Sequence, residues 1–203
     1  MPAREYTPRE RIVYSAAQVV RERGVSGAGL REIVDRADAP WGSLQHYFPD
    51  GKQQLIGEAI GWAGAYAAAR VEEYAAALGT PTPGALFAVM AAQWERDFAR
   101  RGFAAGCPLV AAAADVAADS AALREAVRDA FAAWTAPLTA ALRRMGVPRR
   151  RAASLAVVML SALEGAIVLS RTSEDLRPLR TVVRELRPLL DAAVPGAGSG
   201  RRA

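Results

Sequence analysis

Three side chains that carry much of protein chemistry are almost missing from this 203-residue sequence: it has one cysteine, Cys107, one histidine, His46, and one lysine, Lys52. A single cysteine excludes a disulfide within the chain, and Cys/His zinc sites cannot be assembled, so we expect no metal centre. A catalytic Ser-His-Asp or Cys-His arrangement would have to use His46, and no nucleophile pattern accompanies it. The sequence therefore predicts a protein that is not an enzyme and needs no cofactor.

The chain carries more positive than negative charge, but the excess does not lie in a segment that would identify a binding surface. The formal net charge is +5, and 25 of the 26 basic residues are arginine. A basic protein of this kind suggests a nucleic-acid partner. Residues 1–60, however, carry eight basic and eight acidic side chains, and the excess lies in later segments such as Arg149–Arg151. A DNA-binding surface must therefore be argued from individual residues.

No segment has the pattern of a signal peptide or a membrane anchor. The first residues lack an apolar stretch. The most apolar segment, Ala152–Leu169, is interrupted by Ser154, Ser161 and Glu164, which is more typical of a buried helix than of a membrane span. We expect a soluble, cytoplasmic protein.

Helix signals recur along the whole chain and strand signals are weak, which predicts an all-α fold of about nine helices. Thr7-Pro8-Arg9-Glu10 has the pattern of a capping box, and Gly24 is expected to end the helix that starts there. Two short helices, Leu30–Ala37 and Pro40–Tyr47, precede a long one, Lys52–Leu78. Further helices are predicted within residues 82–101, 108–118, 120–145, 147–171 and 175–193.

The order of these helices predicts two domains and a tail. Residues 1–53 should form a three-helix, helix-turn-helix DNA-binding domain whose reader helix covers residues 40–47. Residues 54–194 should form a helical domain for ligand binding and dimerisation. The glycine-rich residues 195–203 are expected to be disordered.

The predicted reader helix is unusual because polar and aromatic groups surround one apolar anchor, Leu44. Gln45 can form two hydrogen bonds with adenine, and the hydroxyls of Ser43 and Tyr47 can bond phosphates. Gly42 allows a backbone to approach closely. Two alternatives stay open: His46 is either a DNA contact or an ordinary surface histidine, and Tyr47 either contacts phosphate or packs internally.

Longer stretches resemble a known family. Residues Gly24–Leu55, with the skeleton "LREI…A.AP.GSL.HYFP.GK.QL", resemble the DNA-binding half of TetR-type repressors. The segments "GCPLVAAAADVA", "FAAWTAPLTAAL" and "LEGAIVLSR" are similar to the C-terminal domain of the LmrA/YxaF-like branch. The resemblance implies a homodimer, an N-terminal DNA reader, and a C-terminal pocket whose ligand releases the DNA.

The resemblance and the polar pattern together give a set of expected DNA-binding residues. These are Arg31, Pro40, Trp41, Gly42, Ser43, Gln45, His46, Tyr47 and Lys52. Three positions depart from the family pattern: Asp38 replaces a usual turn glycine, Trp41 a common Lys or Arg, and Gln45 a common Tyr. The operator sequence therefore cannot be predicted.

Aromatic residues recur at helical spacing in the second predicted domain. Without the resemblance they indicate ordinary core packing. With it, some are expected to line a cavity for a small, largely apolar or aromatic inducer. The expected lining residues are Trp62, Tyr66, Met90, Trp94, Phe98, Phe131, Trp134, Met159, Leu163 and Glu164. Glu164, a carboxylate inside an apolar helix, either has a structural partner or contacts the ligand. Cys107 is expected to be an inert core thiol rather than a redox sensor.

The last two predicted helices carry apolar stripes that suggest an interface. A two-fold, four-helix packing, as the resemblance implies, would bury Leu155, Met159, Ile167, Leu179, Val183 and Leu186. The alternative is that both stripes are buried inside a single chain.

The sequence thus predicts a ligand-responsive transcriptional regulator, most simply a repressor released from a palindromic operator when an inducer moves the helix Lys52–Leu78. The alternative function is a dimeric helical small-molecule-binding protein or enzyme that has lost DNA binding.

Overall fold

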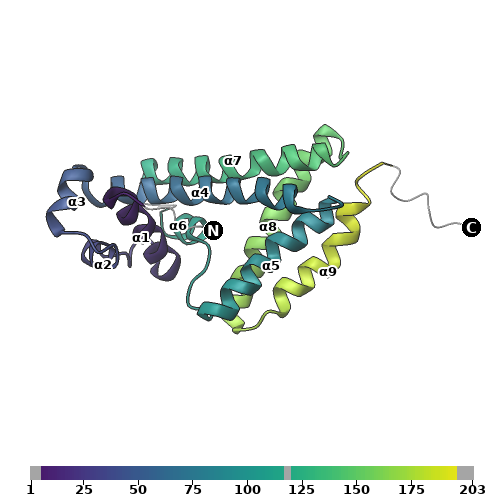
Figure 1. Ribbon diagram of the computed structural model, residues 1–203. Helices are drawn as coiled ribbons and strands as arrows, with labels where there is room; N and C mark the ends of the chain where they lie inside the picture. The colour runs from purple at the N-terminus through teal and green to yellow at the C-terminus, as the bar shows by residue number, and fades with distance from the viewer. Residues whose placement is uncertain (1–5, 117–119, 196–203) are drawn as a thin grey trace, which may run out of the picture. The chain divides into compact units, whose positions relative to one another are not determined.

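The computed structural model describes residues 6–116 and 120–195. Within them the chain forms nine α-helices and no strand, so the predicted all-α fold is confirmed (Figure 1). The helices are α1 (Pro8–Arg23), α2 (Leu30–Arg36), α3 (Trp41–Tyr47), α4 (Gly51–Ala77), α5 (Pro83–Arg101), α6 (Pro108–Val116), α7 (Ala121–Arg144), α8 (Arg149–Ser173) and α9 (Arg177–Asp191).

Local signals set the ends of the first helix. The Thr7 hydroxyl accepts a hydrogen bond from the Glu10 backbone N–H at 3.3 Å, and the Glu10 carboxylate accepts one from the Thr7 N–H at 2.9 Å. This reciprocal capping box satisfies two N–H groups that a helix start leaves unpaired. Gly24 ends α1 with φ +74°, a left-handed conformation that suits glycine. The predicted start and end of this helix are both confirmed.

The chain divides into two compact units whose bounds do not coincide with those of the expected functional domains, which stay a prediction. Unit 1 comprises Met1–Tyr66 with Ala105–Phe131, and unit 2 comprises Ala67–Ala104 with Ala132–Ala203. The boundary expected at residue 53 falls inside α4, which continues without interruption to Ala77. Unit 1 gains a later segment because α6 packs on α1. The expected disordered tail, apart from Pro195, lies outside the described residues.

The core of unit 1 is built around α1. Apolar residues of α1, α2, α3 and α4 are almost completely buried there; they include Ile12, Ala16, Val19, Val20, Ile33, Val34, Leu44, Leu55 and Ile56. The spacing of the α1 residues places them on one helical face, as their sequence pattern predicts. Phe48, directly after α3, is 1% exposed and closes the core below the short helices.

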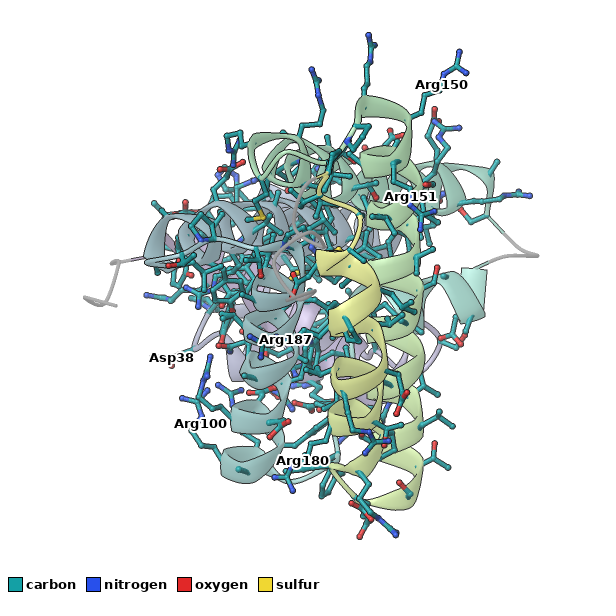
Figure 2. All side chains as sticks on the ribbon, turned by 90° about the vertical axis from the view of Figure 1, so that its right-hand side faces the viewer. Asp38, Arg100, Arg150, Arg151, Arg180 and Arg187 are labelled. Carbon is teal, nitrogen blue, oxygen red and sulfur yellow. The ribbon has the colours of Figure 1, made fainter. Side chains whose placement is uncertain are left out.

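Unit 2 is centred on α5, α8 and α9. Helix α9 packs against both α5 and α8, and Figure 2 looks onto α9 with its neighbours on either side. Arg180 and Arg187 belong to α9, Arg100 to α5, and Arg150 and Arg151 project from the first turn of α8 (Figure 2). The buried side chains of this unit include Leu86, Phe87, Met159, Leu163, Leu179 and Leu190.

Helix α8 is long and apolar enough to cross a membrane by length and composition. Half of its most apolar stretch is buried inside the chain, which is also typical of a core helix in a soluble protein. The burial of half of this stretch therefore agrees with the interpretation of residues 152–169 as a helix packed inside the chain.

The start of α5 and the end of α9 approach each other closely. The Gly84 N–H donates a hydrogen bond to Asp191 Oδ1 at 2.8 Å. A Cβ atom at Gly84 would lie 2.6 Å from Arg187 Cγ and 2.8 Å from both the Arg187 carbonyl oxygen and Asp191 Oδ1. Glycine is needed here because the Arg187 carbonyl belongs to a helix backbone and cannot easily move away.

We predict that Gly84→Ala lowers the free energy of unfolding by about 1–3 kcal/mol, the usual cost of forcing extra atoms into a packed contact. The measurement is urea unfolding followed by circular dichroism. Gly61→Ala in α4 is the control, because a Cβ there meets no atom within 4 Å and alanine favours helix. Equal effects of the two substitutions would contradict the prediction.

Candidate nucleic-acid interface

Helices α2 and α3 are joined by a tight turn that α1 holds in place. Asp38 in this turn has φ +49°, a left-handed conformation that aspartate tolerates better than most residues. Arg11 of α1 donates hydrogen bonds to the Ala37 carbonyl at 3.1 Å and to the Asp38 carbonyl at 3.2 Å. The turn that orients α3 is therefore fixed by a side chain that sequence reasoning did not identify.

Helices α1 and α2 are also joined by an ion pair with two hydrogen bonds. Arg36 donates to the two carboxylate oxygens of Glu22 at 2.8 and 2.9 Å. The hydrogen bond from Arg36 lowers the pKa of Glu22, because the bond favours the charged carboxylate. The angle between α1 and α2 is thereby constrained at the surface as well as in the core.

Helix α3 is anchored by one side chain and exposes most of the others. Leu44 is its only buried residue, at 6% exposure, whereas Trp41 is 55% exposed. Pro40, Gly42, Gln45 and His46 are exposed as well, and Ser43 and Tyr47 are half-buried. The expected reader residues therefore share one short helix whose outer surface is open to solvent.

Two of the expected DNA-binding residues, Arg31 and Lys52, differ from the neighbouring arginines in their ionic partners. Arg9, Arg23 and Arg36 form ion pairs with glutamates. Within the described residues, Arg31 and Lys52 form no ion pair; the Arg31 guanidinium lies 5.9 Å from the ring centroid of Trp41, and Lys52 Nζ is 3.5 Å from the Ser26 carbonyl oxygen.

The aromatic residues around the end of α3 form a connected group. The rings of His46 and Tyr47 have centroids 4.9 Å apart, and those of Tyr47 and Phe48 are 6.4 Å apart. The Arg9 guanidinium lies 5.2 Å from the Phe48 ring. Tyr47 thus packs against its neighbours while part of its surface stays accessible.

The expected pocket residues are divided between the two units. Trp62, Tyr66 and Phe131 belong to unit 1, and Met90, Trp94, Phe98, Trp134, Met159, Leu163 and Glu164 belong to unit 2. In unit 2, all are buried except Trp94, which is half-buried and 5.9 Å from Phe98 between ring centroids. The shared pocket stays a prediction. Cys107 is buried.

In unit 1 the aromatic residues form a surface ladder that sequence reasoning missed in part. Trp62 stacks on Tyr66 with ring centroids 5.4 Å apart and meets Tyr14 edge-on at 5.3 Å. Tyr14 in turn stacks on Tyr6 at 5.7 Å. Trp62 and Tyr66 therefore take part in aromatic packing within unit 1, and their predicted contact with a ligand stays a prediction.

The expected interface residues are mostly core residues. Leu155, Met159, Ile167 and Leu179 are at most 4% exposed in the single chain, and Val183 and Leu186 are half-buried. The four buried residues face the interior of unit 2, as the alternative of burial inside one chain predicts, and the dimer interface itself stays a prediction. The exposed large apolar residues of these helices are instead Val157, Val158, Val168, Leu169 and Leu189.

A three-helix bundle with a short, outwardly polar third helix, followed by further long helices, defines the class of helix-turn-helix DNA-binding proteins with an added helical domain. Comparisons with known proteins give the family. Residues 12–59 match the model of the bacterial regulatory proteins of the tetR family, and residues 83–185 match the C-terminal domain of LmrA/YxaF-like transcriptional regulators.

Relatives resemble the chain over most of its length. It is 37% identical over 193 residues to an HTH-type transcriptional regulator of Mycobacterium tuberculosis, covering 93% of this chain and 96% of that protein. It is 31% identical to the HTH-type transcriptional regulator LmrA of Bacillus subtilis, covering 84% and 90% of the two chains. The chain therefore belongs to the TetR family and is a transcriptional regulator of the LmrA/YxaF-like branch.

Solved structures share the fold. The reduced form of Escherichia coli NemR superimposes with a TM-score of 0.76 at 23% identity, covering 90% of this chain and 96% of NemR. The regulatory protein TetR from Rhodobacter sphaeroides gives a TM-score of 0.75 at 24% identity, with 88% and 96% of the chains covered. The arrangement of an N-terminal helix-turn-helix and a C-terminal helical part is thus shared with known regulators.

We predict that Leu44→Ala lowers the free energy of unfolding by about 2–4 kcal/mol, because it removes the one buried anchor of α3 and leaves a cavity. Gln45→Ala, the neighbouring exposed position, should leave stability nearly unchanged. Denaturant unfolding of the two variants measures the difference. A destabilisation by Leu44→Ala no larger than that by Gln45→Ala would show that α3 is not held by Leu44.

Proposed function

We propose that this regulator is a ligand-responsive repressor that binds a palindromic operator as a homodimer through α3. The observation that carries the proposal is the anchoring of α3 by Leu44 alone, which leaves Trp41, Gln45 and His46 free to reach base edges. An exposed helix of this size fits the major groove of DNA. Arg31 of α2 and Lys52 of α4, which form no ion pair within the described residues, are the proposed phosphate contacts.

Further details follow the same geometry. A Cβ at Gly42 would meet no atom of the described residues within 4 Å, so this position leaves room for a DNA backbone. We propose that Trp41 contacts a sugar or a thymine methyl group, and that Ser43 and Tyr47 bond phosphates. The protein acts in the cytoplasm and is not an enzyme in this proposal.

The proposed dimer uses the exposed face of α8. From Ala153 to Thr172 every exposed residue is uncharged; these residues are Ala153, Ser154, Val157, Val158, Ser161, Gly165, Val168, Leu169 and Thr172. Charged residues usually dominate exposed helix positions, and small residues allow two helices to approach closely. Leu189 with the half-buried Val183 and Leu186 adds apolar surface from α9.

The proposed inducer is a small, largely apolar or aromatic molecule held by the helices of the C-terminal domain. Support comes from the aromatic and sulfur side chains there, which include Trp94, Phe98, Trp134 and Met159. Inducer binding would favour a conformation with weaker DNA affinity, and a 100-fold loss needs about 2.7 kcal/mol of differential binding. Glu164 is either a structural carboxylate or a contact for a polar group of the inducer.

The experiment that tests DNA binding is selection of sequences from a random duplex library by the purified protein. Binding of the recovered sequence is then compared with a scrambled duplex over a series of salt concentrations. Enrichment of a palindrome that is bound more tightly than the scrambled duplex supports the proposal. Equal, weak binding to both duplexes would favour the alternative of a helical small-molecule-binding protein.

We predict that Gln45→Ala weakens binding to the selected operator by about 5- to 100-fold and relaxes the base preference at one position of each half-site, as expected for loss of a two-point base contact. Binding to a scrambled duplex should not change. Gln93→Ala in α5 is the matched control and should leave both affinities as they are. An unchanged base preference would remove Gln45 from direct recognition.

We predict that Leu169→Arg converts the dimer to monomers, because it places a charge in the uncharged face of α8 where Leu169 is 61% exposed. Analytical ultracentrifugation measures the oligomeric state. Ala133→Arg introduces the same charge at an exposed position of α7 and should leave the dimer intact. A dimer that survives Leu169→Arg would place the interface elsewhere.

A further inference from the structure

We propose that Asp115 of α6 is a positioning residue for DNA binding, which acts on the phosphate contact Lys52 through the backbone of Ser26. The proposal rests on the proposed function of Lys52. All three residues belong to unit 1, but they come from α6, from the turn between α1 and α2, and from the first turn of α4.

The Ser26 backbone is held from two sides. Its N–H donates a hydrogen bond to Asp115 Oδ2 at 3.0 Å, and its carbonyl oxygen accepts one from Lys52 Nζ at 3.5 Å. The N–H and the carbonyl lie in the two peptide planes that meet at the Ser26 Cα, so the bond to Asp115 restrains the plane next to the one that Lys52 contacts. Loss of that bond leaves the Ser26 backbone, and with it the carbonyl, less restrained.

The chain leaves space for this carboxylate at Gly24. A Cβ atom there would lie 2.4 Å from Asp115 Oδ2 and 3.2 Å from Asp115 Cγ. Glycine at this position thus has a second role besides ending α1 with a left-handed conformation. It lets the Asp115 side chain reach the turn that contains Ser26.

Helix α6 is also attached to α1 at its other end. The Gly106 N–H donates to the Arg21 carbonyl at 2.9 Å, and Arg21 Nε donates to the Gly106 carbonyl at 3.0 Å. Gly106, just before α6, is thus bonded to α1, and Asp115, near the end of α6, is bonded to Ser26 in the turn that follows α1. A displacement of α6 must therefore disturb either α1 or Ser26.

The consequence for DNA binding follows from the properties of lysine. Its ammonium group sits on a flexible chain that loses rotamer freedom when it is fixed on a phosphate. A hydrogen bond to the Ser26 carbonyl uses one of the three N–H donors and leaves two for phosphate oxygens. Partial ordering of Lys52 before DNA arrives reduces the entropy that binding must overcome.

The test is a double-mutant cycle of Asp115→Ala and Lys52→Ala, with dissociation constants measured on the selected operator and on a random 30-base-pair duplex. We expect Asp115→Ala to weaken binding by about 3- to 10-fold, within the range that ordering one long side chain allows. The same substitution should have no effect when Lys52 is already alanine. Lys52→Ala should itself reduce the salt slope by about one unit.

The control variants separate positioning from general charge. Asp129→Ala in α7 removes an equal negative charge from an exposed position of unit 1, and should leave DNA binding unchanged or slightly tighter. Asp115→Asn keeps an oxygen acceptor for the Ser26 N–H and should restore affinity close to that of the wild type. If Asp115→Ala is unfolded, Asp115→Glu, which keeps the charge but displaces the acceptor, replaces it in the cycle.

The possible outcomes are distinct. Equal weakening by Asp115→Ala with and without Lys52 overturns the inference, as does unchanged binding or a failure of Asp115→Asn to rescue it. If the wild type selects no DNA sequence, the proposed function fails; the cycle on the random duplex still decides the inference, because phosphate contacts do not depend on base sequence.

Discussion

The burial of one face of α1 is the constraint on which the reader helix depends. Ile12, Ala16, Val19 and Val20 are at most 1% exposed, and α1 packs against α2, α3 and α6. The polar side of the same helix then supplies the bonds that fix its neighbours. Arg11 holds the turn before α3, whereas Glu22 pairs with Arg36 of α2 and the backbone and side chain of Arg21 hold Gly106. Because all these contacts start from one rigid helix, any movement of α1 is shared by the whole helix-turn-helix.

A short helix such as α3 gains its order from this framework. Seven residues are too few for a stable isolated helix, since nucleation fixes several dihedral angles to form only the first hydrogen bond. A single buried side chain, Leu44, together with Phe48 and the fixed turn, suffices here because the positions of α1 and α2 are already determined. This has a functional consequence. Because α3 needs only one buried side chain for its own packing, most of its surface remains available for recognition.

Local sequence signals predict the elements well and their surroundings less well. The capping box at Thr7 and the glycine at position 24 act through neighbouring residues, and the helix start and end that they predict agree with the structure. Helix α8 is different because apolar residues lie on more than one of its faces. Periodicity could not tell that Leu155 faces the core while Val157 is exposed. Hydrogen bonds such as that between Asp115 and Ser26 join residues that are 89 positions apart in the sequence, so no local pattern predicts them.

A neutral N-terminal segment can hold a DNA-binding surface because recognition depends on individual exposed side chains and not on the net charge. Residues 1–60 have as many acids as bases, yet Glu22, Glu32 and Glu58 are engaged by Arg36, Arg23 and Arg9. These ion pairs contribute little to the electrostatic field that DNA meets, because paired charges of opposite sign largely cancel at a distance. The groups around α3 that form no ion pair within the described residues include the cations Arg31 and Lys52 but also the exposed acids Asp35, Asp38 and Asp50. Phosphate binding by this segment therefore depends on single donors such as Arg31 and Lys52, which bond individual phosphate oxygens, and not on a locally positive field.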